Sequence, residues 1–175
     1  MTNTKTNLMR KISVEKITLN VGAGKDEPKL KKGIKLITEL VGKAPIQTIS
    51  KKRIPNWGLR QGLPIGCKLT LRGKEAEDLL KRMIKAKENT LFEDQFDNRG
   101  NLAFGIPEYI DIPGAKYNPE IGIMGLEVTI TLTRPGYSIK KRMIRPKKVG
   151  KGHVITKEEA IEFMKQEYGI KIGER

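Results

Sequence analysis

The feature that most constrains the fold is a strict alternation of apolar and polar side chains in short segments. It is cleanest over residues 126–133, where four aliphatic residues alternate with Glu127 and three threonines. Successive side chains of a strand point to opposite sides, so this pattern predicts a strand with one buried and one polar face. Further strands are predicted over residues 14–21, 45–50, 67–72 and 101–106.

Three segments instead have the spacing of amphipathic helices: residues 29–41, 74–89 and 157–168. The first is predicted to end at Gly42. The last should begin with a capping box of Thr156 and Glu159 and end at Gly169. The order of strands and helices predicts an α+β fold, with a mostly antiparallel sheet and helices packed on one face. At this length we expect a single domain over residues 1–175.

The other face of this sheet would be polar and partly open to a ligand. Its outward positions carry cations, an amide and hydroxyls: Lys16, Thr18, Asn20, Lys68, Thr70, Arg72, Thr129, Thr131 and Thr133. Such groups suit contacts to the sugars and phosphates of RNA. They also suit plain solvation, so this pattern alone is a weak indication.

Charge is spread unevenly along the chain. Lys and Arg number 35 against 20 Asp and Glu, a net charge of +15, yet residues 43–74 and 138–153 contain no acid at all. We expect residues 138–153 to form a basic extended segment within the domain. A solvated basic face explains either run alone, but two such runs in one small chain favour nucleic-acid binding.

Sites for catalysis or metal binding are not indicated. Residues 22–25 resemble the end of a phosphate-binding loop, but the glycine spacing is wrong and Asp26 follows Lys25. A turn that ends the strand is the favoured role. His153 is the one histidine and Cys67 lies on the apolar face of its strand. We therefore expect no enzyme activity, no cofactor and no metal.

The sequence also bears on location. No apolar run approaches the roughly 20 residues that cross a membrane, and residues 1–11 are too polar for a signal peptide. A single cysteine rules out an intrachain disulfide, as is usual in a reducing compartment. We expect a cytoplasmic protein without a membrane partner.

Two long runs resemble a known family. Residues 50–73 read SKKRIPNWGLRQGLPIGCKLTLRG, and residues 14–24 read VEKITLNVGAG. Both are similar to the universal large-subunit ribosomal protein L-five family, which binds 5S rRNA. Matching segments also occur at residues 96–101, 105–108 and 125–132, so the resemblance covers almost the whole chain. The region after Arg134 resembles the archaeal branch.

This resemblance implies a non-enzymatic protein that holds 5S rRNA in the central protuberance and touches the large-subunit (23S-type) rRNA. Asn20, Thr70 and Arg72 match the family's 5S contacts in type. Lys43 stands where many relatives have Gln, so a phosphate contact could replace a specific hydrogen bond there. With their neighbours, the candidate 5S rRNA-binding residues are Lys16, Thr18, Asn20, Lys43, Thr48, Ser50, Lys51, Lys52, Lys68, Thr70 and Arg72.

The resemblance further implies that residues 55–65 reach the P-site tRNA. The candidate contacts in this loop are Asn56, Trp57, Arg60, Gln61 and Gly62. A loop rich in Gly and Pro can approach an RNA backbone closely and offer charge and amide donors without reading a fixed sequence. Candidates for other rRNA contacts are Lys140, Lys141, Arg142, Arg145, Lys147 and Lys148.

Two protein partners are also implied by the resemblance. One is the small-subunit head protein S-thirteen, with which the family forms an intersubunit bridge, and the other is the neighbouring 5S-binding protein L-eighteen. Two other functions stay open on the residues alone. The chain could be a free-standing, non-specific nucleic-acid-binding protein or, less favoured, a nucleotide hydrolase that uses residues 22–25.

Overall fold

The computed structural model describes residues 7–173 of the chain. The first six residues, part of the stretch in which we expect no signal peptide, lie outside this range. A five-stranded sheet has the order β2-β3-β1-β6-β5, and all neighbouring strands are antiparallel. The strands are β1 (Ser13–Gly22), β2 (Ile46–Ile49), β3 (Pro64–Leu71), β5 (Asn101–Ile106) and β6 (Leu126–Thr133).

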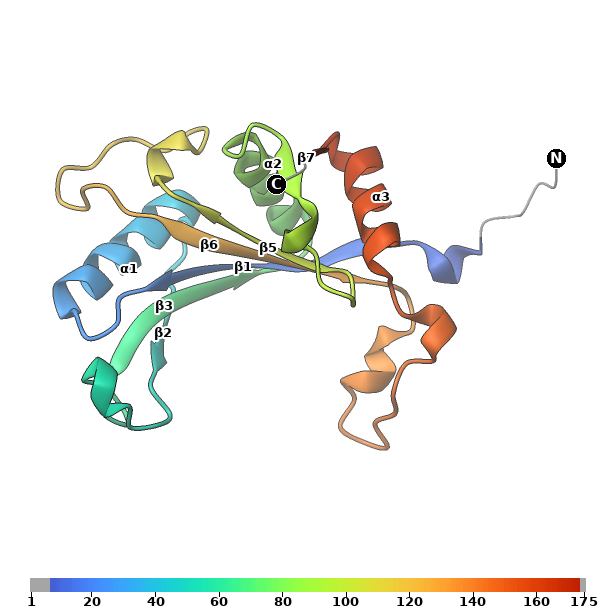
Figure 1. Ribbon diagram of the computed structural model, residues 1–175, viewed down its shortest axis with the longest axis horizontal. Helices are drawn as coiled ribbons and strands as arrows, with labels where there is room; N and C mark the ends of the chain where they lie inside the picture. Colours follow the sequence, from blue (N-terminus) through green and yellow to red (C-terminus); the bar gives the residue numbers. More distant parts are fainter. Residues whose placement is uncertain (1–6, 174–175) are drawn as a thin grey trace.

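Three α-helices pack against this sheet: α1 (Glu27–Val41), α2 (Lys74–Lys85) and α3 (Lys157–Tyr168). Figure 1 shows all three on one side of the sheet, while the opposite face carries none of the described α-helices. The predicted α+β class, with helices on one face of a mostly antiparallel sheet, is confirmed.

The core lies between the sheet and the helices because the strand alternation sends apolar side chains to that side. Ile17, Leu19 and Val21 of β1 are buried there, as is Cys67 of β3. Burial raises the pKa of the Cys67 thiol, as suits a small side chain inside the core. From the helices, Leu36 and other aliphatic residues fill the space above the sheet.

Several predicted boundaries shift. β3 begins at Pro64 rather than at residue 67, because the hairpin with β2 continues past Gly66, which lies opposite Thr48. α2 ends at Lys85 rather than at residue 89, since Glu88 and Asn89 adopt positive φ angles of 53° and 56° that no α-helix allows. α3 has the predicted bounds and capping box.

A small second sheet was not predicted from the sequence. β4 (Thr90–Phe92) pairs in parallel with β7 (Lys171–Gly173), so the end of the chain returns to its middle. Short 3-10 helices were missed as well: η1 (Leu8–Arg10), η2 (Pro55–Trp57), η3 (Glu93–Gln95), η4 (Tyr109–Asp111), η5 (Tyr137–Lys140) and η6 (Lys151–His153). Elements of three or four residues are too short to show a hydrophobic period.

Across residues 7–173, none of the helices combines the length and the apolar character needed to span a membrane.

Candidate nucleic-acid interface

Two basic segments project on the same side of the sheet as its open face. Figure 1 shows the loop between β2 and β3 at one end and residues 138–153, between β6 and α3, at the other. Both belong to the acid-free runs of the sequence. The fold therefore places the open face between two positively charged projections.

The open face itself carries the predicted polar row. Thr18 of the central strand β1 lies opposite Thr70 of β3 and Thr129 of β6, and the Thr18 and Thr70 hydroxyls are 3.4 Å apart. The next outward residue of β1, Asn20, lies opposite Lys68 and donates a 2.9 Å hydrogen bond from its amide to the Glu127 carboxylate. Lys16, which precedes Thr18 on the same strand, lies opposite Thr131. The fold thus brings these candidates together on adjacent strands.

Arg72 and Lys141 meet at one carboxylate, although Arg72 lies just after β3 and Lys141 lies in the projection of residues 138–153. Arg72 Nη1 lies 3.0 Å from Glu15 Oε1, and Lys141 Nζ forms an ion pair with the same oxygen. Burial alone would raise the pKa of Glu15, but the hydrogen bonds from Lys141 and Arg72 outweigh it and hold the pKa below its ordinary value.

Glu15 was missed from the sequence, although a signal was present. Val14 and Ile17 both pack against the core yet are three positions apart, which is impossible in a regular strand. One extra residue must therefore lie between them. The structure has a register shift there, between Val14 and Lys16.

The β2 edge carries candidates with different surroundings. Lys43 pairs with Glu75 of α2 at the surface, and Lys51 and Lys52 are exposed. Ser50 is only 6% exposed, and its hydroxyl donates to the Lys52 carbonyl at 2.7 Å. Its hydroxyl therefore shapes the start of the loop, and an RNA contact of Ser50 stays a prediction.

The projecting loop is held in shape by its own backbone. Ile54 and Leu59 exchange two hydrogen bonds of 2.9 and 3.0 Å, and Leu59 is buried as an anchor. Gly58 turns the chain between them with a φ of 65°, a left-handed value that glycine adopts without strain. The candidate residues at the tip are all exposed: Asn56, Trp57, Arg60, Gln61 and Gly62.

The second projection is anchored at its base by buried side chains. The Tyr137 hydroxyl donates to the His153 carbonyl at 3.2 Å and accepts from the Ile155 amide at 2.9 Å. Tyr137, at the start of the segment, is therefore bound to the backbone at its end. The Lys140 ammonium lies 4.5 Å from the centre of the same ring. All six basic candidates of the segment are exposed: Lys140, Lys141, Arg142, Arg145, Lys147 and Lys148.

A second anchor is Arg134, a buried cation whose side chain is 4% exposed. It donates to the Arg10 carbonyl at 3.1 Å and to Glu159 Oε1 of α3 at 2.8 Å. Burial alone would raise the pKa of Glu159, but the hydrogen bonds from Arg134 and Thr156 hold it below its ordinary value. Arg134 therefore has a structural role, unlike the exposed cations beyond it.

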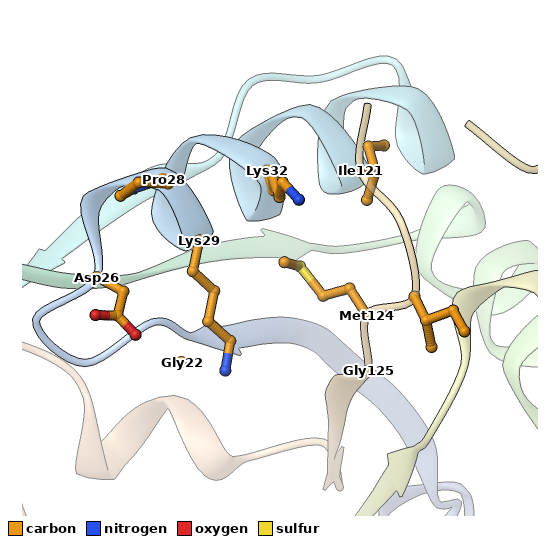
Figure 2. A pocket seen from close by; sticks show the side chains of 9 residues that line it. Gly22, Asp26, Pro28, Lys29, Lys32, Ile121, Met124 and Gly125 are labelled. Carbon is orange, nitrogen blue, oxygen red and sulfur yellow. The ribbon is translucent and has the colours of Figure 1, made fainter. Parts of the chain in front are cut away.

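The turn at residues 22–25 lacks the features of a phosphate site. The amides of Ala23 and Gly24 both donate to the Ile65 carbonyl, at 2.9 and 3.0 Å, whereas a phosphate loop points its amides at the ligand. The pocket beside it, of about 670 Å³, is lined by Asp26 as well as by Lys29 and Lys32 (Figure 2), so its charges are mixed. Within residues 7–173, no cluster of His, Cys, Asp and Glu could hold a metal ion.

An open polar sheet between two basic projections is typical of structural proteins that lie against nucleic acid. The chain belongs to the ribosomal protein L5 family. Residues 7–60 match the family model described as ribosomal protein L5, and residues 64–163 match the model that describes the C-terminus of the same family. This is a family of ribosomal proteins, so the chain is not an enzyme, and the nucleotide hydrolase is excluded.

Relatives of similar length extend this result. The chain is 47% identical to a large ribosomal subunit protein uL5 of Nanoarchaeum equitans, over 94% of this chain and 97% of the relative. It is 45% identical to the uL5 of Nitrosopumilus maritimus, over 99% and 100% of the two chains. The uL5 of Methanosphaera stadtmanae is 44% identical over 95% and 99%. The resemblance to the archaeal type of the family is confirmed.

Proposed function

We propose that this chain is a structural constituent of the large ribosomal subunit that binds 5S rRNA through its open sheet face and attaches it in the central protuberance. Relatives that match over nearly their whole length carry the name of a large-subunit protein. The observation that carries the proposal is the polar row of Thr18, Thr70 and Thr129 across three strands, between two acid-free projections.

The chemistry of this face suits the wide minor groove of an A-form RNA helix. That groove displays 2′-hydroxyls, which can both donate to and accept from hydroxyls and amides, and it is flanked by phosphates, which accept from hydroxyls, amides and cations. Thr18, Thr70 and Asn20 would contact sugars, while Lys68 and Arg72 would neutralise phosphates and release their counterions. The net charge of +15 supports the same partner.

Further contacts belong to the same proposal. The exposed tip of the β2–β3 loop would touch the P-site tRNA, and residues 138–153 would contact the large-subunit rRNA. S-thirteen would meet the chain as part of an intersubunit bridge, and L-eighteen would lie beside it on 5S rRNA. The family resemblance and the exposure of both projections support these assignments.

A binding assay with 5S rRNA tests the sheet face. Arg72→Ala should weaken binding by about 1–3 kcal/mol, the range for losing a charge-assisted hydrogen bond. Arg60→Ala is the matched control, because it removes an exposed arginine from the same acid-free run. It should leave 5S binding intact and change only tRNA positioning. Unchanged binding of Arg72→Ala would contradict the assignment, and equal losses would make the loop part of the 5S site.

The alternative of a free-standing, non-specific nucleic-acid-binding protein rests on charge alone. It predicts equal affinity for 5S rRNA and for duplex RNA of mixed sequence, with a steep dependence on salt. The proposed function instead predicts that excess duplex fails to displace 5S rRNA at moderate salt. Competition between the two RNAs therefore separates the alternatives.

A further inference from the structure

Glu15 is the extra residue of a β-bulge in the central strand. Val14 and Lys16 pair with Leu132 and Thr131, which are consecutive in β6, so Glu15 is the additional residue between them. A bulge of this kind twists the strand locally and re-aims the side chain.

The re-aimed carboxylate joins two parts of the surface that are distant in sequence. One oxygen, Oε1, accepts from Arg72 at the end of β3 and from Lys141 in the basic segment 138–153. The Glu15 side chain is 10% exposed, whereas those of Arg72 and Lys141 are 61% and 49% exposed. A nearly buried anion therefore holds two cations that water could solvate without it.

Stability alone does not account for this arrangement. Removing a carboxylate from water is costly unless its oxygens are well satisfied. The second oxygen, Glu15 Oε2, is the one buried side-chain polar atom within residues 7–173 that has no hydrogen-bond partner. The hydrogen bonds from Arg72 and Lys141 offset the burial of the carboxylate, in keeping with the lowered pKa of Glu15, but they satisfy only Oε1. The contact is better explained by what it does to the two cations.

We propose that Glu15 is a positioning residue of the RNA interface, which fixes Arg72 at the end of β3 and ties segment 138–153 to the sheet through Lys141. This inference rests on the proposed function, because it takes the open face as the RNA-binding surface. Arg and Lys side chains lose much rotamer freedom on binding, and a contact that orders them beforehand lowers that cost.

The charges and the shape around Glu15 agree with this role. Two cations share one anion, so the cluster keeps a net positive charge and still attracts a phosphate. A basin of about 540 Å³ lies beside it, lined by Glu15, Lys16, Lys140 and Lys141 among others. An RNA backbone entering this basin would meet cations that are already in place.

Hydrogen exchange of the free protein tests the tether. The Lys141 amide donates to the Ser138 carbonyl at 2.9 Å and reports on the segment. Glu15→Gln should accelerate its exchange roughly 3- to 10-fold through easier local opening. Glu167→Gln, the same charge change on the exposed surface of α3, should leave it unchanged. Equal exchange rates of the Lys141 amide in both variants would overturn the proposal that Glu15 tethers the segment.

Binding to 5S rRNA tests the positioning role, because charge and position predict opposite signs. On charge alone, removing an acid from a polyanion-binding surface strengthens binding. The proposal predicts that Glu15→Gln weakens 5S binding roughly tenfold, because the Arg72 and Lys141 side chains would then have to be ordered during binding. Glu167→Gln should not weaken it. Glu15→Asp keeps the charge but shortens the reach, so it should weaken binding too. Binding of Glu15→Gln as tight as that of the unchanged chain would refute the role.

A double-mutant cycle excludes a general effect on folding. If Glu15 acts through Arg72 and Lys141, Glu15→Gln should lose most of its effect in a chain in which both cations are already Ala. An undiminished effect there would overturn the proposal. If instead Arg72→Ala binds 5S rRNA as tightly as the unchanged chain, the proposed function's site is wrong, and the positioning role falls with it. The hydrogen-exchange experiment would still test whether Glu15 holds segment 138–153 to the sheet.

Discussion

Replacing the buried Arg134 with Ala should destabilise the protein strongly, although the cations that follow it in the sequence, from Lys140 to Lys148, are exposed. Its side chain ties η1 to α3 by donating to the Arg10 carbonyl at 3.1 Å and to Glu159 at 2.8 Å. The bond to the backbone carbonyl is worth about 1 kcal/mol. Glu159 is 38% exposed, so its ion pair is discounted for solvent to about 1 kcal/mol.

The lost packing of the arginine stem adds to these contacts. A buried side chain cut back to Ala leaves a partly collapsed cavity, which for this stem costs on the order of 1 kcal/mol. The third contact, to the His153 carbonyl at 3.5 Å, adds little, because that oxygen keeps its bond from Tyr137. We therefore expect Arg134→Ala to lower the free energy of unfolding by about 3 kcal/mol.

Urea denaturation followed by circular dichroism measures this change. The midpoint should fall while the m-value stays constant, because both chains expose the same surface on unfolding. Glu159→Gln is the matched control, since Gln at this position can keep the capping box, and it should lose only about 1 kcal/mol. A loss below about 1 kcal/mol for Arg134→Ala would refute the reasoning and make Arg134 an ordinary surface cation.

Other predictions concern close packing, pH and a surface pair. Gly66→Ala should cost about 1–3 kcal/mol in thermal unfolding, because its Cβ would lie 2.7 Å from the Val21 carbonyl oxygen. The pKa of Glu159 is lowered on folding, so the ionised carboxylate stabilises the folded protein. This stabilisation is complete above the ordinary pKa of 4.5 and is lost as the pH falls through the lower pKa of the folded state. The urea midpoint should therefore drop on acidification below pH 4.5. Lys43→Ala should change stability by less than about 1 kcal/mol, since its pair with Glu75 is exposed, yet weaken 5S binding.

Much of the sheet was predictable because one periodicity decided it. The alternation over residues 126–133 determined which side chains of β6 are buried, and the capping box at Thr156 located α3. β4 and β7 could not be predicted, because three-residue strands carry no period and their partners are distant in sequence. The single-domain assignment of residues 1–175 stays a prediction.

The candidate interface was predictable as a surface but not in its internal contacts. The sequence indicated which residues of β1 and β3 face outward, and the structure brings them together. It could not show that Ser50 turns its hydroxyl into the loop or that Arg134 is buried, because composition does not reveal which polar side chains face inward. Nor could composition reveal that Lys141 and Arg72 share one carboxylate.

The position of β1 in the sheet has a consequence for the order in which the chain is made. This strand, Ser13–Gly22, is among the first parts to be synthesised, but its two sheet neighbours are β3 and the much later β6, Leu126–Thr133. Pairings between such distant segments form slowly and only after both exist. The row of threonines on the open face is therefore complete only when about three quarters of the chain has been translated, and a nascent chain shorter than this lacks the surface that we assign to RNA.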